Sequence, residues 1–145
     1  MTIMCTIPII HIREKAGEPR VLNFHDLKLN NKEPVYIQIA LYVKRQILLK
    51  RAATGDKLPS RRELAAQLNV NPNTVQKAFR LMEEEGYVHT SGNQGSIIYV
   101  DSAIAASIEE ELTRQMVREF IASAKEIDLS FKKVIDLISD LWEQD

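Results

Sequence analysis

Residues 58–75 read LPSRRELAAQLNVNPNTV, and this stretch decides the fold. Ser60 followed three residues later by Glu63 is a capping box, which predicts that a short helix begins directly after Ser60. Asn71 and Pro72 are the residue types of an N-cap and of a first helical position, so a further helix is expected to begin there. Two helices joined by so short a turn indicate a helix–turn–helix motif.

The chain upstream of this motif predicts a longer first helix. Pro34 suits a first helical turn, and the apolar residues that follow it recur at helical spacing until the turn at Gly55. Lys44 is expected on the polar side of this helix. The connector 56–59 is short and allows one extended segment that pairs with another part of the backbone, as a strand does.

The chain downstream predicts a β-hairpin. The third helix is expected to end at Gly86. Two strand-like runs, 87–90 and 96–100, then flank the segment 91–95, whose glycines and asparagine tolerate a turn. Three helices followed by a hairpin are the elements of a winged helix–turn–helix domain.

Residues 101–145 predict two further helices with rich apolar stripes. A 45-residue helical hairpin cannot bury such stripes alone, and leaving them in water is unfavourable by about 0.8 kcal/mol per methylene. A second copy of the chain would cover them, so we expect a homodimer. The dimerisation residues predicted are Ile108, Leu112, Phe120, Phe131, Val134, Ile138, Leu141 and Trp142.

The predicted fold class is therefore mainly α with a small β-hairpin, a winged helix–turn–helix domain followed by a two-helix dimerisation tail. Residues 1–33 are expected to be an N-terminal extension, whose structure and role the sequence leaves open. Residues 34–100 form the expected DNA-binding domain and residues 101–145 the expected tail.

The distribution of charge supports this division. The 145 residues carry a formal net charge of −1. Residues 1–33 have a net charge of +1, residues 34–100 carry nine basic and five acidic side chains for +4, and residues 101–145 carry five basic and eleven acidic for −6. Near-neutrality is thus a cancellation. A basic segment beside an acidic one indicates nucleic-acid binding or separate roles for the two segments, and the charge alone is equally compatible with two ordinary solvated surfaces.

Several motifs agree in order and spacing with one family: PVYIQI at 34–39, LPSRRELA at 58–65, VNPNTV at 70–75 and EGYV at 85–88. With these motifs the sequence resembles the GntR family of bacterial transcription regulators, and its short helical tail resembles the YtrA subfamily. The resemblance implies a dimeric cytoplasmic regulator, a repressor or an activator, that reads a palindromic double-stranded DNA operator. It also implies control of transporter genes. The hairpin departs from the family pattern, because Ser91 and Gly92 stand where arginines are common.

The DNA-binding residues predicted are Arg61, Arg62, Asn71, Asn73, Thr74, Gln76, Lys77, Arg80, Gln94 and Gly95. Arginine forks suit guanine or phosphate, and asparagine and glutamine amides suit adenine. At the start of the third helix, free backbone N–H groups and the helix dipole are expected to attract a phosphate. Two alternatives stay open at this point. Arg62 could instead pair with Glu63 or Glu85, and Asn71 could serve only as a cap.

Other classes of function find little support. The three histidines have no metal-ligand spacing, the single cysteine, Cys5, excludes a cysteine-rich zinc site, and no phosphate-binding loop or nucleophile motif is present, so we expect neither an enzyme nor a cofactor. No apolar run approaches the roughly 18 residues of a membrane span. The main alternative is a winged-helix module that binds protein instead of DNA. A small-molecule effector remains unknown.

Overall fold

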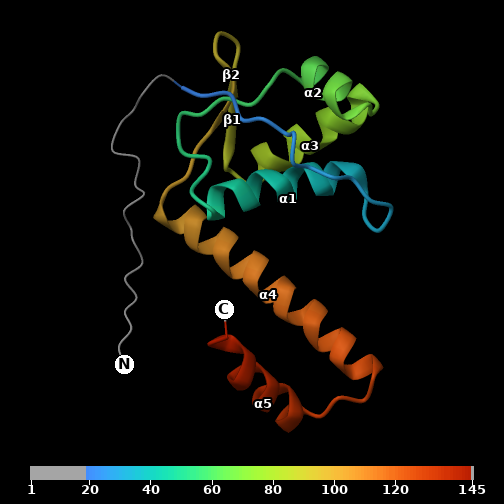
Figure 1. Cartoon of the computed structure of the whole chain (residues 1–145). Coiled ribbons are helices and arrows are strands. Elements are labelled where there is room, and N and C mark those ends of the chain that lie inside the picture. The colour runs from blue at the N-terminus through green and yellow to red at the C-terminus, as the bar shows by residue number, and fades with distance from the viewer. Residues whose placement is uncertain (1–18, 145) are drawn as a thin grey trace. The chain divides into compact units, whose positions relative to one another are not determined.

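The computed structural model describes residues 19–144 and confirms a mainly helical fold with one small hairpin (Figure 1). By backbone proximity the chain divides after Ile108 into two compact units. The elements follow in the order α1 (Val35–Leu48), α2 (Arg61–Leu68), α3 (Pro72–Glu84), β1 (Val88–Ser91), β2 (Gly95–Ile98), α4 (Ser102–Glu126) and α5 (Phe131–Trp142).

The helix–turn–helix motif has the predicted caps. The Ser60 hydroxyl accepts a hydrogen bond from the backbone N–H of Glu63 (3.1 Å), and the Glu63 carboxylate accepts one from the N–H of Ser60 (3.4 Å). The Asn71 side chain caps α3 at the N–H of Asn73 (2.8 Å). Asn69 turns the chain between the helices with a φ of 55°, a left-handed conformation that asparagine tolerates.

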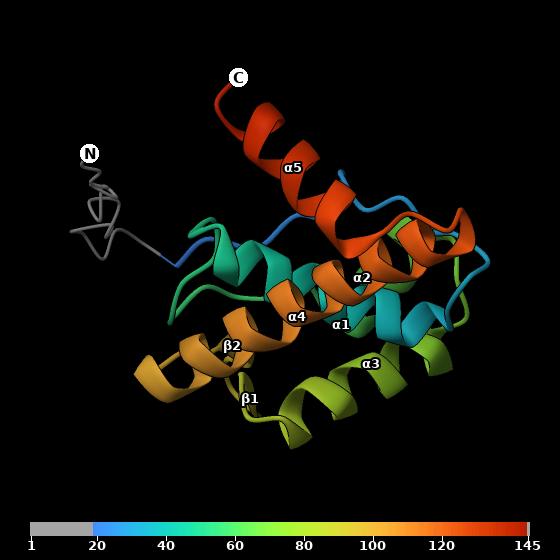
Figure 2. The ribbon, with the colours of Figure 1, turned by 90° about the horizontal axis from the view of Figure 1, so that it is seen from below.

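The core of the first unit lies between the helices. Figure 2 shows α1 and α3 side by side, and their facing side chains, such as Val43 and Phe79, are buried. Leu64 of α2 is also fully buried. Since burying one large aliphatic or aromatic side chain is favourable by about 1.5–3 kcal/mol, this packing fixes the orientation of α3 within the domain.

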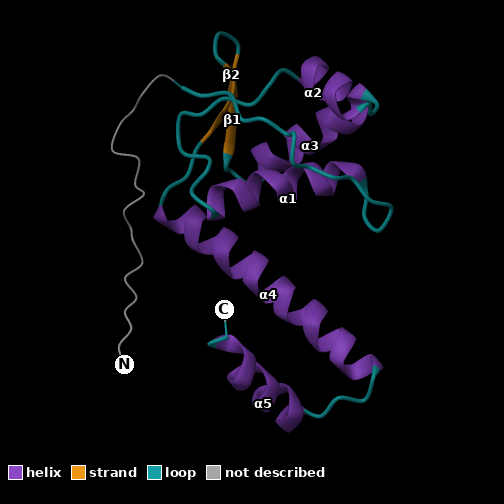
Figure 3. Ribbon diagram, viewed as in Figure 1, coloured by secondary structure: helices purple, strands orange, loops and turns teal. Residues whose placement is uncertain are grey.

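The hairpin is the two-stranded antiparallel sheet drawn in orange in Figure 3. Its register pairs Val88 with Ile98 and Ser91 with Gly95, and the predicted turn lies between them. Lys57 makes an isolated antiparallel bridge to Ile97, which confirms the extended pairing allowed for the 56–59 connector. We call the loop and strands from Val88 to Ile98 the wing.

Residues 19–33, here called the N-terminal arm, pack on the first unit. The N–H of Leu22 donates to the carbonyl of Lys57 (2.8 Å). Phe24 is 1% exposed, with its ring 5.0 Å from that of Tyr42, and the Tyr42 hydroxyl donates to the carbonyl of Asn23 (3.1 Å). The domain therefore includes the described part of the predicted extension. Residues 1–18 lie outside the described residues.

Lys44 does not lie on a polar face, so that prediction was wrong. It is 4% exposed, its Nζ lies 3.1 Å from Glu85 Oε2, and it sits 5.5 Å from the centroid of the Tyr87 ring. A carboxylate and an aromatic face compensate the buried ammonium, which helical spacing alone does not reveal.

The two tail helices were predicted correctly. One of the expected dimerisation residues, Ile108, is however buried in the first unit. Ile108 is 3% exposed in the single chain and belongs to the first unit, so it cannot serve as a free contact surface. Leu112 and Val134 are half-buried. The remaining predicted side chains are exposed: Phe120, Phe131, Ile138, Leu141 and Trp142.

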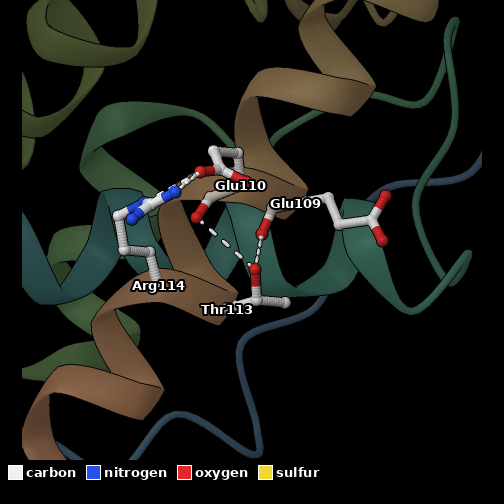
Figure 4. A network of polar contacts seen from close by, with 4 residues as sticks. All are labelled: Glu109, Glu110, Thr113 and Arg114. Atoms are coloured by element: carbon white, nitrogen blue, oxygen red, sulfur yellow. Dashed lines mark hydrogen bonds and ion pairs between the residues drawn. The ribbon is translucent and has the colours of Figure 1, made fainter.

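The polar side of α4 is organised by contacts within the helix. Figure 4 shows Arg114 Nε donating to Glu110 Oε1 (2.8 Å) and the Thr113 hydroxyl donating to the backbone carbonyl of Glu109 (2.7 Å). The ion pair of Glu110 with Arg114, four residues later, stabilises an exposed helix by a few tenths of a kcal/mol. Arg114 and Thr113 thus find their partners within the helix itself.

Candidate nucleic-acid interface

Helix α3 presents two chemically different faces. Val75, Ala78, Phe79 and Met82 are buried in the domain. Between its first residue, Pro72, and its last, Glu84, both of which are exposed, the side chains exposed to solvent are polar or cationic: Asn73, Gln76, Lys77 and Arg80. Amides and cations on one exposed face are what base edges and phosphates require, so α3 has the composition of a recognition helix.

The N-terminus of α3 offers less than the sequence suggested. The N–H of Asn73 donates to the Asn71 side chain, and the N–H groups of Thr74 (2.9 Å) and Val75 (3.4 Å) donate to the Asn71 carbonyl. Pro72 has no N–H. The expectation of free backbone N–H groups for a phosphate was therefore wrong, since all of these donors are already used. The helix dipole and the side chains of Asn73 and Thr74 remain available.

Arg62 lies on the exposed surface at the start of α2. Within residues 19–144 no ion pair joins it to Glu63 or Glu85. The Glu63 carboxylate serves the capping box, and the Glu85 carboxylate binds Lys44. The surface-pairing alternative for Arg62 is thus absent from the structure, and its guanidinium can meet a ligand.

Arg61 has a different environment from its neighbour. Its Nη2 lies 3.1 Å from Glu83 Oε1, and its guanidinium carbon lies 4.8 Å from the centroid of the Phe79 ring. Both partners belong to α3. The predicted DNA ligand Arg61 therefore already binds within the domain, with its side chain 34% exposed.

The remaining predicted residues lie around α3 and at the tip of the wing. Lys77 Nζ is 4.9 Å from the centroid of the Tyr36 ring at the start of α1, which limits the conformations of this cation. Gln94 and Gly95 are exposed at the turn, where Gly95 has a φ of 72°. This left-handed backbone favours glycine, and the absent side chain allows close approach of a ligand.

A metal site and a membrane span are two alternatives that residues 19–144 do not offer. These residues contain no cluster of His, Cys, Asp or Glu that could hold a metal ion. None of their helices is long and apolar enough to cross a membrane. Two carboxylates near the cationic residues, Glu83 and Glu85, are both engaged by basic side chains.

Comparison with known proteins decides the family. Residues 35–98 match the model of the bacterial regulatory proteins of the gntR family. The chain is also 35% identical over 118 residues to the uncharacterized HTH-type transcriptional regulator YhcF of Bacillus subtilis, covering 81% of this chain and 98% of YhcF. The chain belongs to the GntR family. This GntR protein is a transcription regulator with a DNA-binding winged helix–turn–helix domain.

Further relatives agree with this assignment. The GntR chain is 33% identical over 110 residues to the HTH-type transcriptional repressor YtrA of Bacillus subtilis, covering 74% of this chain and 84% of YtrA. The structure of a GntR family transcriptional regulator from Listeria monocytogenes matches with a TM-score of 0.66 and 29% sequence identity. The match covers 77% of this chain and 98% of the Listeria chain. The structure of YtrA from Sulfolobus acidocaldarius, a GntR-family transcription factor, matches with a TM-score of 0.50 and 31% sequence identity. The match covers 72% of this chain and 99% of the Sulfolobus chain.

Sequence reasoning missed one residue beside the predicted site. Glu83 is absent from the predicted site, yet it is the partner of Arg61 and of the Thr90 hydroxyl. Its helical position on the same side as Phe79, four residues earlier, is a signal that could have placed it beside the domain core.

Proposed function

We propose that this GntR regulator binds an inverted-repeat DNA operator as a homodimer and represses transcription there. The observation that carries the proposal is the exposed face of α3, which combines Gln76, Lys77 and Arg80 while the opposite face is buried. The observed engagement of nearby carboxylates by Lys44 and Arg61 limits the negative charge next to this face.

Within this proposal the exposed side chains divide into two chemical roles. Lys77 and Arg80 neutralise phosphates and supply affinity, and the amides of Asn73 and Gln76 read base edges. Arg62 contacts a guanine or a phosphate with its planar guanidinium. Gln94 and Gly95 bring the wing to the backbone or to the minor groove. These assignments describe one half-site.

The homodimer is supported by the exposed apolar residues of the tail. Phe131 is 81% and Trp142 is 80% exposed in the single chain, an unfavourable state for large aromatic side chains in water. A second copy supplies an equivalent apolar surface by symmetry. Two recognition helices related by a two-fold axis then enter successive major grooves about 34–36 Å apart.

Repression, rather than activation, is supported by the similarity to a relative named as a repressor. The YtrA-like subfamily fits the length match with that protein and the short tail. Control of transporter genes and action in the cytoplasm are further parts of the proposal, which includes no effector.

The experiment is selection of binding sequences from a pool of randomised duplexes by the full-length chain, followed by sequencing. We expect an inverted repeat whose half-sites are centred about one helical turn apart, bound by two chains. Affinity should fall steeply with salt, by a factor of about 10³ or more between 50 and 200 mM if about six phosphates are contacted. Recovery of a single asymmetric site bound by one chain would contradict the dimeric operator. Failure to recover any sequence would favour the protein-binding module.

A further inference from the structure

One carboxylate joins three separate elements of the DNA-binding domain. Glu83, near the C-terminal end of α3, accepts hydrogen bonds on the same oxygen, Oε1, from Arg61 Nη2 (3.1 Å) and from the Thr90 hydroxyl (2.6 Å). Arg61 is the first residue of α2, and Thr90 belongs to β1. Glu83 therefore connects the recognition helix to both the second helix and the wing.

The network extends to the second strand of the wing. The Thr90 hydroxyl has one proton and donates it to Glu83, so the Ser96 hydroxyl, 2.8 Å away, must donate to Thr90 Oγ1. Ser96 is buried, and its own carbonyl accepts from the N–H of Leu58, which precedes α2. Both strands of the wing are thus tied to the side chain of Glu83.

Arg61 is held in this network from two directions. Its guanidinium lies over the Phe79 ring, at 4.8 Å from the centroid, while Nη2 binds Glu83. An aromatic face and a carboxylate on one helix fix the plane of the guanidinium more firmly than either alone. The neighbouring Arg62 is exposed and has neither contact.

We propose that Glu83 is a positioning residue for DNA binding, and that Arg61 acts through it instead of contacting DNA. Glu83 holds the start of α2 and the wing in fixed orientation on α3, so that Arg62, the recognition helix and the wing tip reach the duplex together. This inference rests on the proposed DNA-binding function. The inference predicts that removal of a negative charge weakens DNA binding. This is the opposite of what the charge alone would do, because a carboxylate near phosphates opposes binding.

The direction of this change in affinity can be tested directly on the full-length chain, with the duplex recovered by selection. We expect Glu83→Ala to weaken binding about tenfold, since charge-assisted hydrogen bonds to two elements are lost. Glu83→Gln keeps an oxygen acceptor and should recover part of the affinity. The matched control is Glu84→Ala, which removes one exposed carboxylate from the same helix and should leave binding unchanged or slightly tighter.

A second readout separates positioning by Arg61 from direct contact. The slope of log affinity against log salt falls in magnitude by about 0.9 for each phosphate contact removed. Arg61→Gln should weaken binding several-fold and leave this slope unchanged, whereas Arg80→Gln should reduce it. Hydroxyl-radical footprinting of Glu83→Ala should show loss of protection where the wing lies, with protection by α3 retained.

The outcomes are distinct. Tighter or unchanged binding by Glu83→Ala would overturn the positioning role of Glu83. A reduced salt slope for Arg61→Gln would overturn the role of Arg61 and make it a DNA ligand. Circular dichroism melts must show that each variant is folded, and if Glu83→Ala is not, Glu83→Gln and Arg61→Gln decide the question. Absence of any salt-dependent duplex binding by the unsubstituted chain would refute the proposed function itself.

Discussion

At the scale of single residues, the decisive property of a basic side chain here is whether a carboxylate already binds it. Lys44 and Arg61 are engaged by Glu85 and Glu83, while Arg62 and Arg80 lie on the exposed surface. The count of nine basic side chains in the 34–100 segment therefore overstates the number of cations that can meet phosphates. The DNA-binding surface depends on a few particular residues and not on bulk charge.

Tyr42 gives a prediction at this scale. Burial, and secondarily the negative charge of Asp26, raise the pKa of the Tyr42 hydroxyl above its usual value of about 10. The unfolded chain then loses this proton at lower pH than the folded chain does. The stabilisation is fully present below pH of about 10 and is lost as pH rises through the folded pKa.

Tyr42→Phe removes this titration together with the hydrogen bond to the Asn23 carbonyl. We expect the variant to be less stable by about 1 kcal/mol at pH 8, and the difference from the unsubstituted chain to shrink above pH of about 10. Urea unfolding of both proteins at a series of pH values measures the loss of stability at pH 8 and the change of this difference with pH. A constant difference across this range would contradict the raised pKa.

At the scale of elements, local rules predicted most of the fold. Caps at Ser60 and Asn71 and the stop at Gly86 involve residues within a few positions of one another, so the sequence contains their whole physical cause. The partners of Lys44 and Arg61 lie 41 and 22 residues away. Such pairings depend on how helices pack, which periodicity within one helix cannot determine, and this is why the Glu83 network was not predicted.

The start of α3 gives a prediction at the scale of elements. Asn71→Asp keeps the cap, and the carboxylate is favourable at a helix N-terminus, so the free energy of unfolding should be unchanged or slightly higher. The same carboxylate should weaken operator binding about tenfold if this end of α3 faces phosphates. Anisotropy titrations and thermal melts separate the two effects.

The control for this experiment is Asn71→Ala, which loses the cap without adding charge. It should lower the stability by about 1 kcal/mol and affect DNA binding much less than Asn71→Asp does. Equal affinity of Asn71→Asp and the unsubstituted chain would show that the α3 N-terminus is directed away from the duplex.

At the scale of the whole molecule, the chain has two segments of opposite net charge. Residues 34–100 carry a net charge of +4 and residues 101–145 a net charge of −6. Phosphates attract the first region and repel the second, so the field of the chain itself favours approach to DNA through the winged helix. The proposed role of the tail depends on its apolar residues and not on its charge, and their proposed partner is a second tail.

Phe131→Glu tests that partnership. Phe131 is the first residue of α5, where a carboxylate favours the helix, so each chain should keep its secondary structure. Placing charge in the apolar surface should raise the dimer dissociation constant about 100-fold or more, which corresponds to about 2.7 kcal/mol. Sedimentation equilibrium measures this shift. The adjacent exposed Lys132→Glu should remain dimeric, and an unchanged dimer for Phe131→Glu would place the interface elsewhere.

The N-terminal arm has a practical consequence for dissecting the protein. The family match begins at residue 35, yet Phe24 of the arm is among the most completely buried side chains. The Gln38 side chain of α1 also binds backbone groups of Asn30 and Glu33, which both belong to the arm. A fragment trimmed to the matched residues would open a hole beside Tyr42 and leave the Gln38 amide without its partners. A fragment that keeps these contacts must therefore include the arm and cannot begin at the first helix.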